Sequence, residues 1–527
     1  MRRGPNPSQS STTAGNGLGI AIARHREQWV DNVGMRILRP AGQGAIGRRA
    51  FLSSLAALGS LRVLHGQASL GACALQNSPE PWSRFRGPNA SGLATGSGYP
   101  IEFGPTKNVI WKRPFPMGKS SPVLTADRVV LTANVDNRLQ VISVDRATGK
   151  TVWERSLARA RREFKRTLNH GASSSAAIEG TNVYAFFGDY GIVSYDADGK
   201  ERWKTPLGPF SSLWGMATSP VIAGDTVVLL LEGIVHSSIA GFDRNSGRKK
   251  WEVERPPFAL NYSTPILRSG SDNRCEVLAL GPNELVAYDP GNGERRWSTK
   301  VLPGSIVASP TLGDDDTLVS MIFPSENGRA FPDKDGDGIV TAAEISALSK
   351  DPQITRVEQM IADETGNRDG KITQEEWNLF WRTQQGRPAI TATSIGAPGE
   401  DAPNRGTRWS YSKGVARVAT PLIYDGILYF INMGGILTAL NAKTGEALKV
   451  ARLQCALENY YASPVAAAGV VYFTSETGKV VAVRAGADWS VLACNDLDEP
   501  CYATPALSEG RIFVRTSQSL ACFGTRL

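Results

Sequence analysis

Residues 144–153 read Val-Asp-Arg-Ala-Thr-Gly-Lys-Thr-Val-Trp, and this order of apolar strand, Asp, turn residues, Gly and Trp recurs along the chain. In a turn the Asp side chain can form a hydrogen bond with the nearby backbone, and the Gly can adopt a positive φ, so each copy predicts a β-hairpin. A large flat ring at the start of the return strand is suited to packing between neighbouring sheets. Weaker copies occur at 440–448 and 483–489, and the strong copies end at four tryptophans: Trp153, Trp203, Trp251 and Trp297.

A small residue followed by proline opens most repeats, and an alternating apolar strand comes next. The openings are Ser121-Pro122, Ser219-Pro220, Thr264-Pro265, Ser309-Pro310, Thr420-Pro421, Ser463-Pro464 and Thr504-Pro505, with Ser174-Ser175-Ala176 in the copy after Trp153. Eight such openings, with about four short strands each, predict an all-β protein, an eight-bladed β-propeller. A linear β-solenoid is the alternative, although its periods are normally shorter.

The last repeat, residues 501–524, lacks a strand that contains tryptophan. Residues 109–113 (Val-Ile-Trp-Lys-Arg) supply such a strand near the other end of the repeat region. We therefore predict that 109–113 completes the final blade and closes the ring, which removes sheet edges that invite aggregation. The repeat tryptophans are expected to pack between blades and not to stack on a ligand.

The Asp-x-x-x-Gly-x-x-x-Trp repeats resemble those of the PQQ-type propeller superfamily, the quinoprotein and BamB-like proteins. Residues 82–92 (Trp-Ser-Arg-Phe-Arg-Gly-Pro-Asn-Ala-Ser-Gly) are similar to the start of secreted, non-catalytic members. The resemblance covers 82–330, expected to hold the closing strand and blades 1 to 5, and 405–524, expected to complete blades 5 to 8. It implies the fold and says little about activity.

Between those two parts, residues 333–344 read Asp-Lys-Asp-Gly-Asp-Gly-Ile-Val-Thr-Ala-Ala-Glu and match the twelve-residue EF-hand calcium loop. Calcium takes six to eight oxygen ligands, which this spacing can wrap around one point. A solvated acidic turn is the other interpretation of the same residues. The expected ligands are Asp333, Asp335, Asp337, the Ile339 carbonyl, Thr341 and Glu344.

A second loop at 365–376 fits the same pattern less well, because Thr365 stands where the pattern has Asp. It is expected to bind metal weakly, or chiefly to pair with the first loop. We predict an α-helical EF-hand insertion over 331–385, with helices at 353–362 and 374–382, and a linker over 386–404. The expected ligands of the second loop are Asn367, Asp369, Lys371 and Glu376.

The N-terminal segment 1–74 reads as an export signal with an extension. Arg48-Arg49-x-Phe51-Leu52 resembles a twin-arginine signal, and the apolar run that follows is too short to span a bilayer. Cleavage near Cys73 predicts a periplasmic or secreted protein, whereas acylation of Cys73 predicts a lipid tether. A buried N-terminal helix remains the alternative, and the true start is Met1 or Met35.

Composition excludes several classes of function. Residues 75–527 contain 49 Lys and Arg against 48 Asp and Glu. This nearly neutral part of the chain gives no electrostatic reason to expect binding to nucleic acid. The four histidines cannot comfortably supply a histidine-ligated metal site or a catalytic triad. No Cys-Cys pair and no Cys-x-x-Cys-His motif occur, which argues against PQQ as a cofactor and against haem. No catalytic residue is assigned.

The remaining cysteines and two polar segments leave alternatives open. Cys494 can pair with Cys501 or with Cys455, and Cys275 and Cys522 are expected to be buried thiols. Residues 159–166 are expected to form a solvated loop or short helix, with contact to an acidic surface or phosphate as the other interpretation. The segments around Trp214 and at 169–170 are read as connecting loops; the alternatives are that Trp214 forms the floor of a ligand pocket and that 169–170 line the central channel.

These observations predict an exported, monomeric, non-catalytic propeller that binds a protein or polymer partner through one face and carries a calcium-loaded insertion. The alternative is a dehydrogenase that uses PQQ and calcium in the propeller channel. A hydrolase or lyase acting on polysaccharide is a third hypothesis, but no pair of acids at an interpretable spacing supports it.

Overall fold

The computed structural model describes residues 82–525, except 160–170, 211, 213, 234–235, 257–260, 270–273, 314–316, 323–330, 349–358, 360–361, 363–368, 383–386 and 396–405. The predicted export signal at 1–74 therefore lies outside the described residues. Among the residues described, no helix is both long enough and apolar enough to cross a bilayer.

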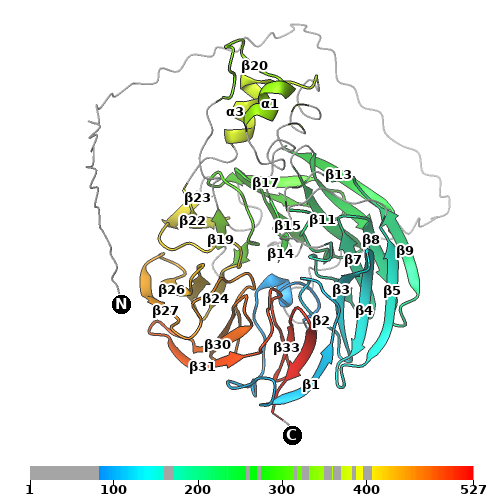
Figure 1. The fold of residues 1–527 in the computed structure, drawn as a ribbon, viewed down its shortest axis with the longest axis vertical. Coiled ribbons are helices and arrows are strands. Elements are labelled where there is room, and N and C mark those ends of the chain that lie inside the picture. Colours follow the sequence, from blue (N-terminus) through cyan, green and yellow to red (C-terminus); the bar gives the residue numbers. More distant parts are fainter. Residues whose placement is uncertain are drawn as a thin grey trace, which may run out of the picture. The chain divides into compact units, whose positions relative to one another are not determined.

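Eight four-stranded antiparallel sheets are arranged around a central axis (Figure 1). We number these blades 1 to 8. The strands of the first four are as follows: blade 1, β2 (Val123–Leu124), β3 (Arg128–Val135), β4 (Arg138–Asp145) and β5 (Thr151–Ala158); blade 2, β6 (Ala177–Glu179), β7 (Asn182–Phe187), β8 (Gly191–Tyr195) and β9 (Glu201–Pro206); blade 3, β10 (Val221–Ala223), β11 (Thr226–Glu232), β12 (Ser237–Asp243) and β13 (Lys249–Arg255); blade 4, β14 (Ile266–Ser269), β15 (Cys275–Leu280), β16 (Glu284–Tyr288) and β17 (Arg295–Lys300).

The second half of the ring repeats this order, with two exceptions. An insertion interrupts blade 5, and a strand from far upstream completes blade 8. The strands are as follows: blade 5, β18 (Thr311–Leu312), β19 (Thr317–Ile322), β22 (Ala389–Ser394) and β23 (Gly406–Tyr411); blade 6, β24 (Leu422–Tyr424), β25 (Ile427–Ile431), β26 (Ile436–Asn441) and β27 (Ala447–Arg452); blade 7, β28 (Val465–Ala467), β29 (Val470–Thr474), β30 (Lys479–Arg484) and β31 (Ser490–Asp496); blade 8, β32 (Ala506–Ser508), β33 (Arg511–Arg515), β34 (Ser519–Phe523) and β1 (Val109–Pro114).

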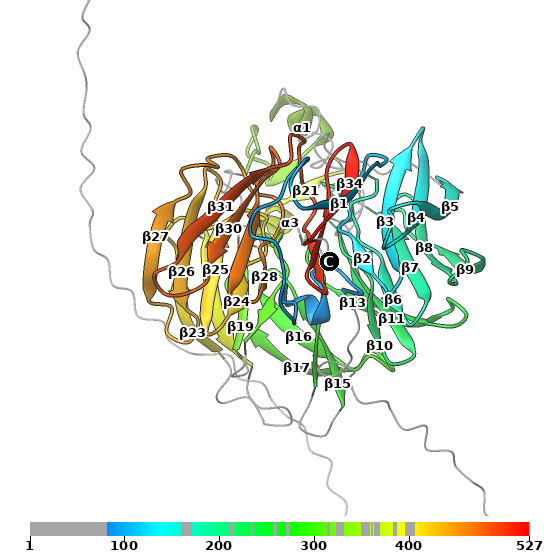
Figure 2. The same cartoon turned by 90° about the horizontal axis from the view of Figure 1, so that it is seen from below.

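The strand β1 closes the ring as predicted. It pairs antiparallel with β34, with Trp111 opposite Cys522 and Arg113 opposite Leu520. Figure 2 shows β1 and β34 side by side. The eight-bladed β-propeller expected from the repeats is therefore confirmed.

The prediction of a linker over 386–404 is wrong in part. Residues 389–394 form β22, the third strand of blade 5, which pairs with β19 on one side and β23 on the other. The segment Ala-Ile-Thr-Ala-Thr-Ser consists of β-branched and small residues, which suits a middle strand covered on both faces. Its neighbouring Pro, Gly and Ala residues hid this pattern.

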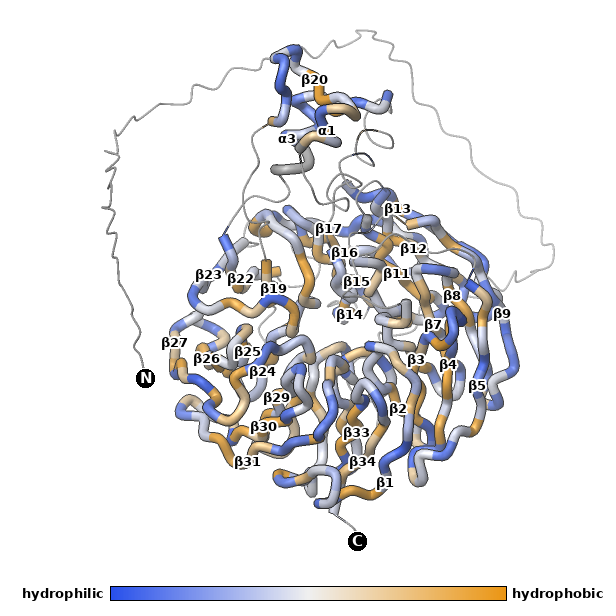
Figure 3. The backbone as a smooth tube through the Cα atoms, viewed as in Figure 1, coloured by the Kyte–Doolittle hydropathy of each residue, from blue (hydrophilic) through white to orange (hydrophobic). Residues whose placement is uncertain are grey.

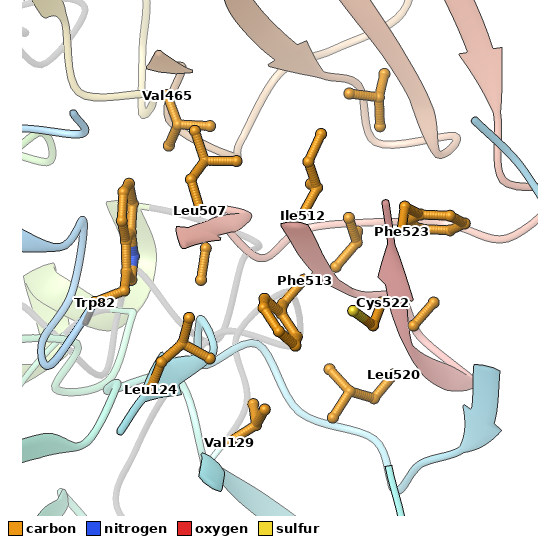
Figure 4. Packing of buried hydrophobic residues seen from close by; sticks show 14 of the residues in the cluster. Trp82, Leu124, Val129, Val465, Leu507, Ile512, Phe513, Leu520, Cys522 and Phe523 are labelled. Carbon is orange, nitrogen blue, oxygen red and sulfur yellow. The ribbon is translucent and has the colours of Figure 1, made fainter. Parts of the chain in front are cut away.

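Hydrophobic side chains fill the spaces between neighbouring blades. Figure 4 shows one such cluster, in which Trp82 lies near Leu124 of blade 1 and Leu507 of blade 8, with Phe513 further along. The middle strands are buried, whereas an outer strand such as β9 alternates between buried and exposed residues. The hydropathy colouring shows the same contrast, with β9 largely hydrophilic (Figure 3).

Five tryptophans each join one blade to the next, whereas the indole N–H of Trp297 donates to Glu276 of its own blade. The indole N–H of Trp153 in blade 1 donates to the carbonyl of Ala197, in the Asp-to-Gly turn of blade 2, at 2.8 Å. A Cβ on Gly199 of that turn would lie 2.6 Å from the Trp153 ring, and Gly199 has φ +74°. The repeat thus pairs a Trp with the Gly of the following repeat. Equivalent bonds join Trp111 to Arg146, Trp203 to Arg244, Trp251 to Pro290 and Trp409 to Ala442.

The structure decides between the disulfide alternatives. Cys455, just after β27 in blade 6, is bonded to Cys494 on β31 in blade 7, with their Cα atoms 6.4 Å apart. The Cys494–Cys501 alternative is wrong, because Cys501 is a buried free thiol whose Sγ donates to the Arg515 carbonyl. Cys522 is a buried free thiol as predicted. The same prediction for Cys275 is wrong, since Cys275 is disulfide-bonded.

The inserted segment contains two short strands and two short helices among its described residues. Strand β20 (Ile339–Val340) precedes helix α1 (Ala342–Leu348), and strand β21 (Ile372–Thr373) precedes helix α3 (Gln374–Arg382). The two strands pair antiparallel, with Val340 opposite Ile372. The helix predicted at 353–362 lies almost entirely outside the described residues.

The Trp–Gly contact between blades can be tested with two glycines of similar φ. Gly199→Ala places a methyl group against Trp153, whereas Gly224 has φ +59° and open space where its Cβ would lie. We expect Gly224→Ala to lower the free energy of unfolding by about 1–2 kcal/mol through the left-handed conformation alone. Gly199→Ala should cost about 1–3 kcal/mol more, from overpacking. Equal urea midpoints for the two variants would contradict this account.

Candidate functional site

The innermost ends of the blades meet in a closed circle of hydrogen bonds. In each blade, one backbone N–H donates to the hydroxyl oxygen of the equivalent residue in the next blade, over distances of 2.9–3.1 Å. The last bond runs from Thr504 N of blade 8 to Ser121 Oγ of blade 1. We call these residues the hydroxyl ring: Ser121, Ser175, Ser219, Thr264, Ser309, Thr420, Ser463 and Thr504.

The opening motif of each repeat is explained by this ring. Each ring residue stands two positions before the innermost strand of its blade, where no strand pairs with its backbone N–H, so this N–H needs another acceptor. A Ser or Thr hydroxyl from the neighbouring blade supplies it. The proline that usually follows has no N–H to satisfy and is suited to the first residue of an edge strand.

A second layer lies two residues before each ring member, because alternate residues of an extended segment share one side. Both layers line a central cavity of about 140 Å³. We call the second layer the rim: Lys119, Ser173, Ala217, Tyr262, Val307, Val418, Tyr461 and Tyr502.

Residues 82–94 form the floor of this cavity, and Phe85 is among the lining residues. This segment, which we call the plug, includes a 3-10 helix, η1 (Pro88–Ala90). The plug forms hydrogen bonds with residues that each stand three positions after a hydroxyl-ring residue in the sequence. The bonds are Trp82 O with Leu124 N, Ser83 O with Ile178 N, the Asn89 side chain with both backbone groups of Leu267, and Gly92 O with Ala466 N.

Arg86 ties the plug to the other side of the ring. It is fully buried, and its guanidinium donates to the Pro421 carbonyl at 2.9 Å and to Thr311 Oγ1 at 3.4 Å. Burial lowers the pKa of Arg86 to about 9. The plug residues Trp82, Arg86 and Asn89 therefore join blades 1, 4, 5 and 6 across the axis.

One side of the rim is aromatic and cationic. The Lys119 ammonium lies 4.6 Å from the centroid of the Tyr502 ring, and the Tyr461 and Tyr502 rings lie 5.6 Å apart. Desolvation by burial lowers the pKa of Lys119 and raises that of Tyr461. Among the described residues that line the cavity, Lys119 is the one cation and none is a carboxylate.

The sequence analysis did not single out the rim. The rim could have been found from the sequence, because every rim residue stands two positions before the Ser or Thr of a repeat opening. Trp214, considered for a pocket floor, is not among the described lining residues, where Ala217 holds the position. Residues 169–170 and most of the basic run 159–166 lie outside the described residues.

The cavity lining does not fit a calcium–PQQ centre. Calcium in such a centre needs several oxygen ligands of high charge density, and PQQ brings three carboxylates of its own. The described lining offers one cation, Lys119, and no carboxylate. Tyrosines and small hydroxyl residues make up most of the remainder, so no oxidation step is assigned to the channel.

The acidic loop of the insertion holds its carboxylates together. Asp333, Asp335 and Asp337 each bring an oxygen to within 4.8 Å of the others. Asp333 accepts from Gly336 N and Gly338 N, both at 2.7 Å, and the bond from Gly338 is the main reason that its pKa is lowered. A hydrogen bond from Asp337 N lowers the pKa of Asp335, but desolvation and nearby carboxylates leave it raised.

The other predicted ligands lie close by in the chain. Glu344 accepts from Lys334 N at 3.0 Å and from Thr341 N at 2.8 Å, which brings it back to the start of the loop. The second loop repeats this pattern, since Glu376 accepts from Thr373 N at 2.8 Å. Ile339 lies on the short strand β20, Asp369 and Lys371 lie just before β21, and Asn367 is outside the described residues.

Comparison with known proteins fits the ring of blades. Residues 94–229, 214–315 and 235–489 match the family model described as outer membrane protein assembly factor BamB, of the PQQ-like propeller type. The chain belongs to this family. The match leaves the EF-hand assignment untested and does not by itself give the chain's partner.

Individual relatives are distant. The chain is 21% identical over 371 residues to the outer membrane protein assembly factor BamB of Yersinia pestis, covering 67% of this chain and 86% of that protein. The crystal structure of BamB from Moraxella catarrhalis aligns with TM-score 0.51 and 13% identity, over 79% of this chain and 97% of that one. A quinohemoprotein alcohol dehydrogenase from Pseudomonas putida HK5 aligns with TM-score 0.50 and 10% identity, over 85% and 80%. At these identities the structural matches show the fold alone.

Proposed function

We propose that this BamB-family chain is a non-catalytic scaffold that binds a protein partner outside the cytoplasm. The observation that carries the proposal is the channel, whose described lining contains no carboxylate and a single cation. A propeller enzyme that held calcium and PQQ in the channel would need carboxylate ligands there. A rigid ring with variable surface loops suits binding instead.

The class of partner is proposed from the family. A matched relative is named as an outer membrane protein assembly factor, so we infer a partner in the assembly of outer membrane proteins. The sequence of the N-terminal segment supports export to the periplasm through a twin-arginine signal. We propose that the chain acts as a monomer, since its own β1 completes blade 8 and no strand of a second copy is needed there.

Deleting the gene in its native host tests the proposal. We expect the amount of folded outer membrane protein to fall and to be restored by the wild-type chain, since a lost scaffold slows assembly without removing a chemical step. Quantitative mass spectrometry of the outer membrane measures the effect. An unchanged outer membrane proteome, or dye-linked oxidation of an alcohol after addition of PQQ, would refute it.

We further propose that the insertion is an EF-hand pair whose first loop binds calcium. Three grouped aspartates, a glutamate returned to the loop start, and glycines at φ +79° and +81° in Gly336 and Gly338 support this. The pairing of β20 with β21 joins the two loops as in paired EF-hands. Glu344 and Thr341 also form a helix-capping pair, which accounts for part of this geometry without metal.

A titration with calcium or terbium separates the two roles of Glu344. We expect the full chain to bind with a dissociation constant of about 10⁻⁴–10⁻³ M, the range of extracellular modules. Glu344→Gln should weaken binding by about tenfold or more, because calcium loses a bidentate carboxylate while the capping group remains. Isothermal calorimetry gives both constants.

The matched control is Glu376→Gln, which changes the equivalent glutamate of the second loop. Because that loop lacks the first carboxylate, this variant should leave the main binding event nearly unchanged. If Glu344→Gln binds calcium as tightly as the wild type, the assignment of the first loop is wrong.

A further inference from the structure

The hydroxyl ring has donors that the fold does not use. Each ring oxygen accepts a backbone N–H, and among the described residues no ring hydroxyl donates its own proton to a protein acceptor. All eight side chains line the cavity, and all are at most 4% exposed. A buried hydroxyl that finds no acceptor is unfavourable, so the cavity favours a content that accepts hydrogen bonds.

The rim adds one positive charge and an aromatic wall. Tyr461, Tyr502 and Lys119 come from the consecutive blades 7, 8 and 1, and their contacts place them together on one side. Tyr262 belongs to blade 4, which lies opposite blade 8 in a ring of eight. An aromatic wall that carries one cation, with Tyr262 opposite it, suits a compact ring that carries one negative charge.

The plug gives the cavity a floor. Phe85 lines it, and the bonds from the plug to Leu124, Ile178, Leu267 and Ala466 lie beyond the ring. A ligand therefore has the hydroxyl ring below it and the rim around it. At about 140 Å³ the cavity accommodates a small molecule or one terminal group, and not a polymer threaded through the axis.

We propose that this cavity binds a monosaccharide bearing a single carboxylate, a uronic acid. The carboxylate would pair with the Lys119 ammonium, and the sugar ring would lie between the tyrosines. Its hydroxyl oxygens would accept from the hydroxyl ring. One cation balances one negative charge, so a phosphate dianion is a poorer match. An apolar ligand would leave the ring hydroxyls without acceptors.

The electrostatics of the rim agree with this choice. Desolvation lowers the pKa of Lys119, which shows that its charged form is held less favourably there than in water. An anion beside the ammonium offsets that cost. Burial raises the pKa of Tyr461, so its hydroxyl group keeps its proton and can donate it.

Calorimetry on the full chain tests the proposal with three probes: D-glucuronate, D-glucose and acetate. We expect glucuronate to bind at one site, and glucose and acetate to bind about tenfold or more weakly, because each lacks one half of the recognised chemistry. The absence of saturable glucuronate binding would overturn the proposal. Equal affinity for glucose would remove the role of the charge, and equal affinity for acetate would remove the role of the sugar.

Two variants locate the site. Lys119→Met should weaken glucuronate binding by about 10- to 100-fold, as expected for one charge-assisted hydrogen bond. Lys413→Met removes an exposed charge that is not part of the cavity lining, and should change nothing. Saturating glucuronate should also slow chemical acetylation of Lys119 but not of Lys413. Equal binding by both variants, or equal acetylation rates with and without ligand, would place the ligand elsewhere.

Discussion

The rest of the molecule depends on a circle of eight hydrogen bonds that has no beginning and no end. Each blade gives one N–H to the next and offers one hydroxyl to the blade before it. The circle therefore satisfies one backbone N–H beside the inner strand of every blade with a side chain of fixed reach. The same residues fix the width of the channel, so the requirement that edges be satisfied also shapes the cavity.

A second contact, between Trp and Gly, holds the blades together further out. The tryptophan of one repeat lies on the turn glycine of the next, where a Cβ would collide with the indole ring. At the contact between Trp153 and Gly199, glycine is needed for two reasons. The backbone there has a positive φ, and the indole ring leaves no room for a side chain. The spacing of Gly and Trp within each repeat therefore reflects a contact between neighbouring blades.

The sequence predicted the ring of eight blades well, because the sequence patterns that indicate a blade are short and repeated. The hairpin turns, the openings and the closing strand at 109–113 follow from short patterns, and β1 pairs with β34 as expected. It predicted the channel poorly, because Lys119 and Tyr502 meet only when blade 8 closes on blade 1. β22 was missed because residues around it are rich in Pro and Gly, and the Cys455–Cys494 pair was decided by the distance between two blades.

The plug has a consequence for how the chain is made. Residues 82–94 leave the ribosome before any blade, yet their partners include Leu267, Pro421 and Ala466. β1 likewise waits for β34, at the far end of the polypeptide. Such long-range pairing makes maturation slow and leaves growing chains exposed to misassembly. The plug and β1 are thus synthesised before the blades that hold them, and a chain that ends before β34 cannot close blade 8.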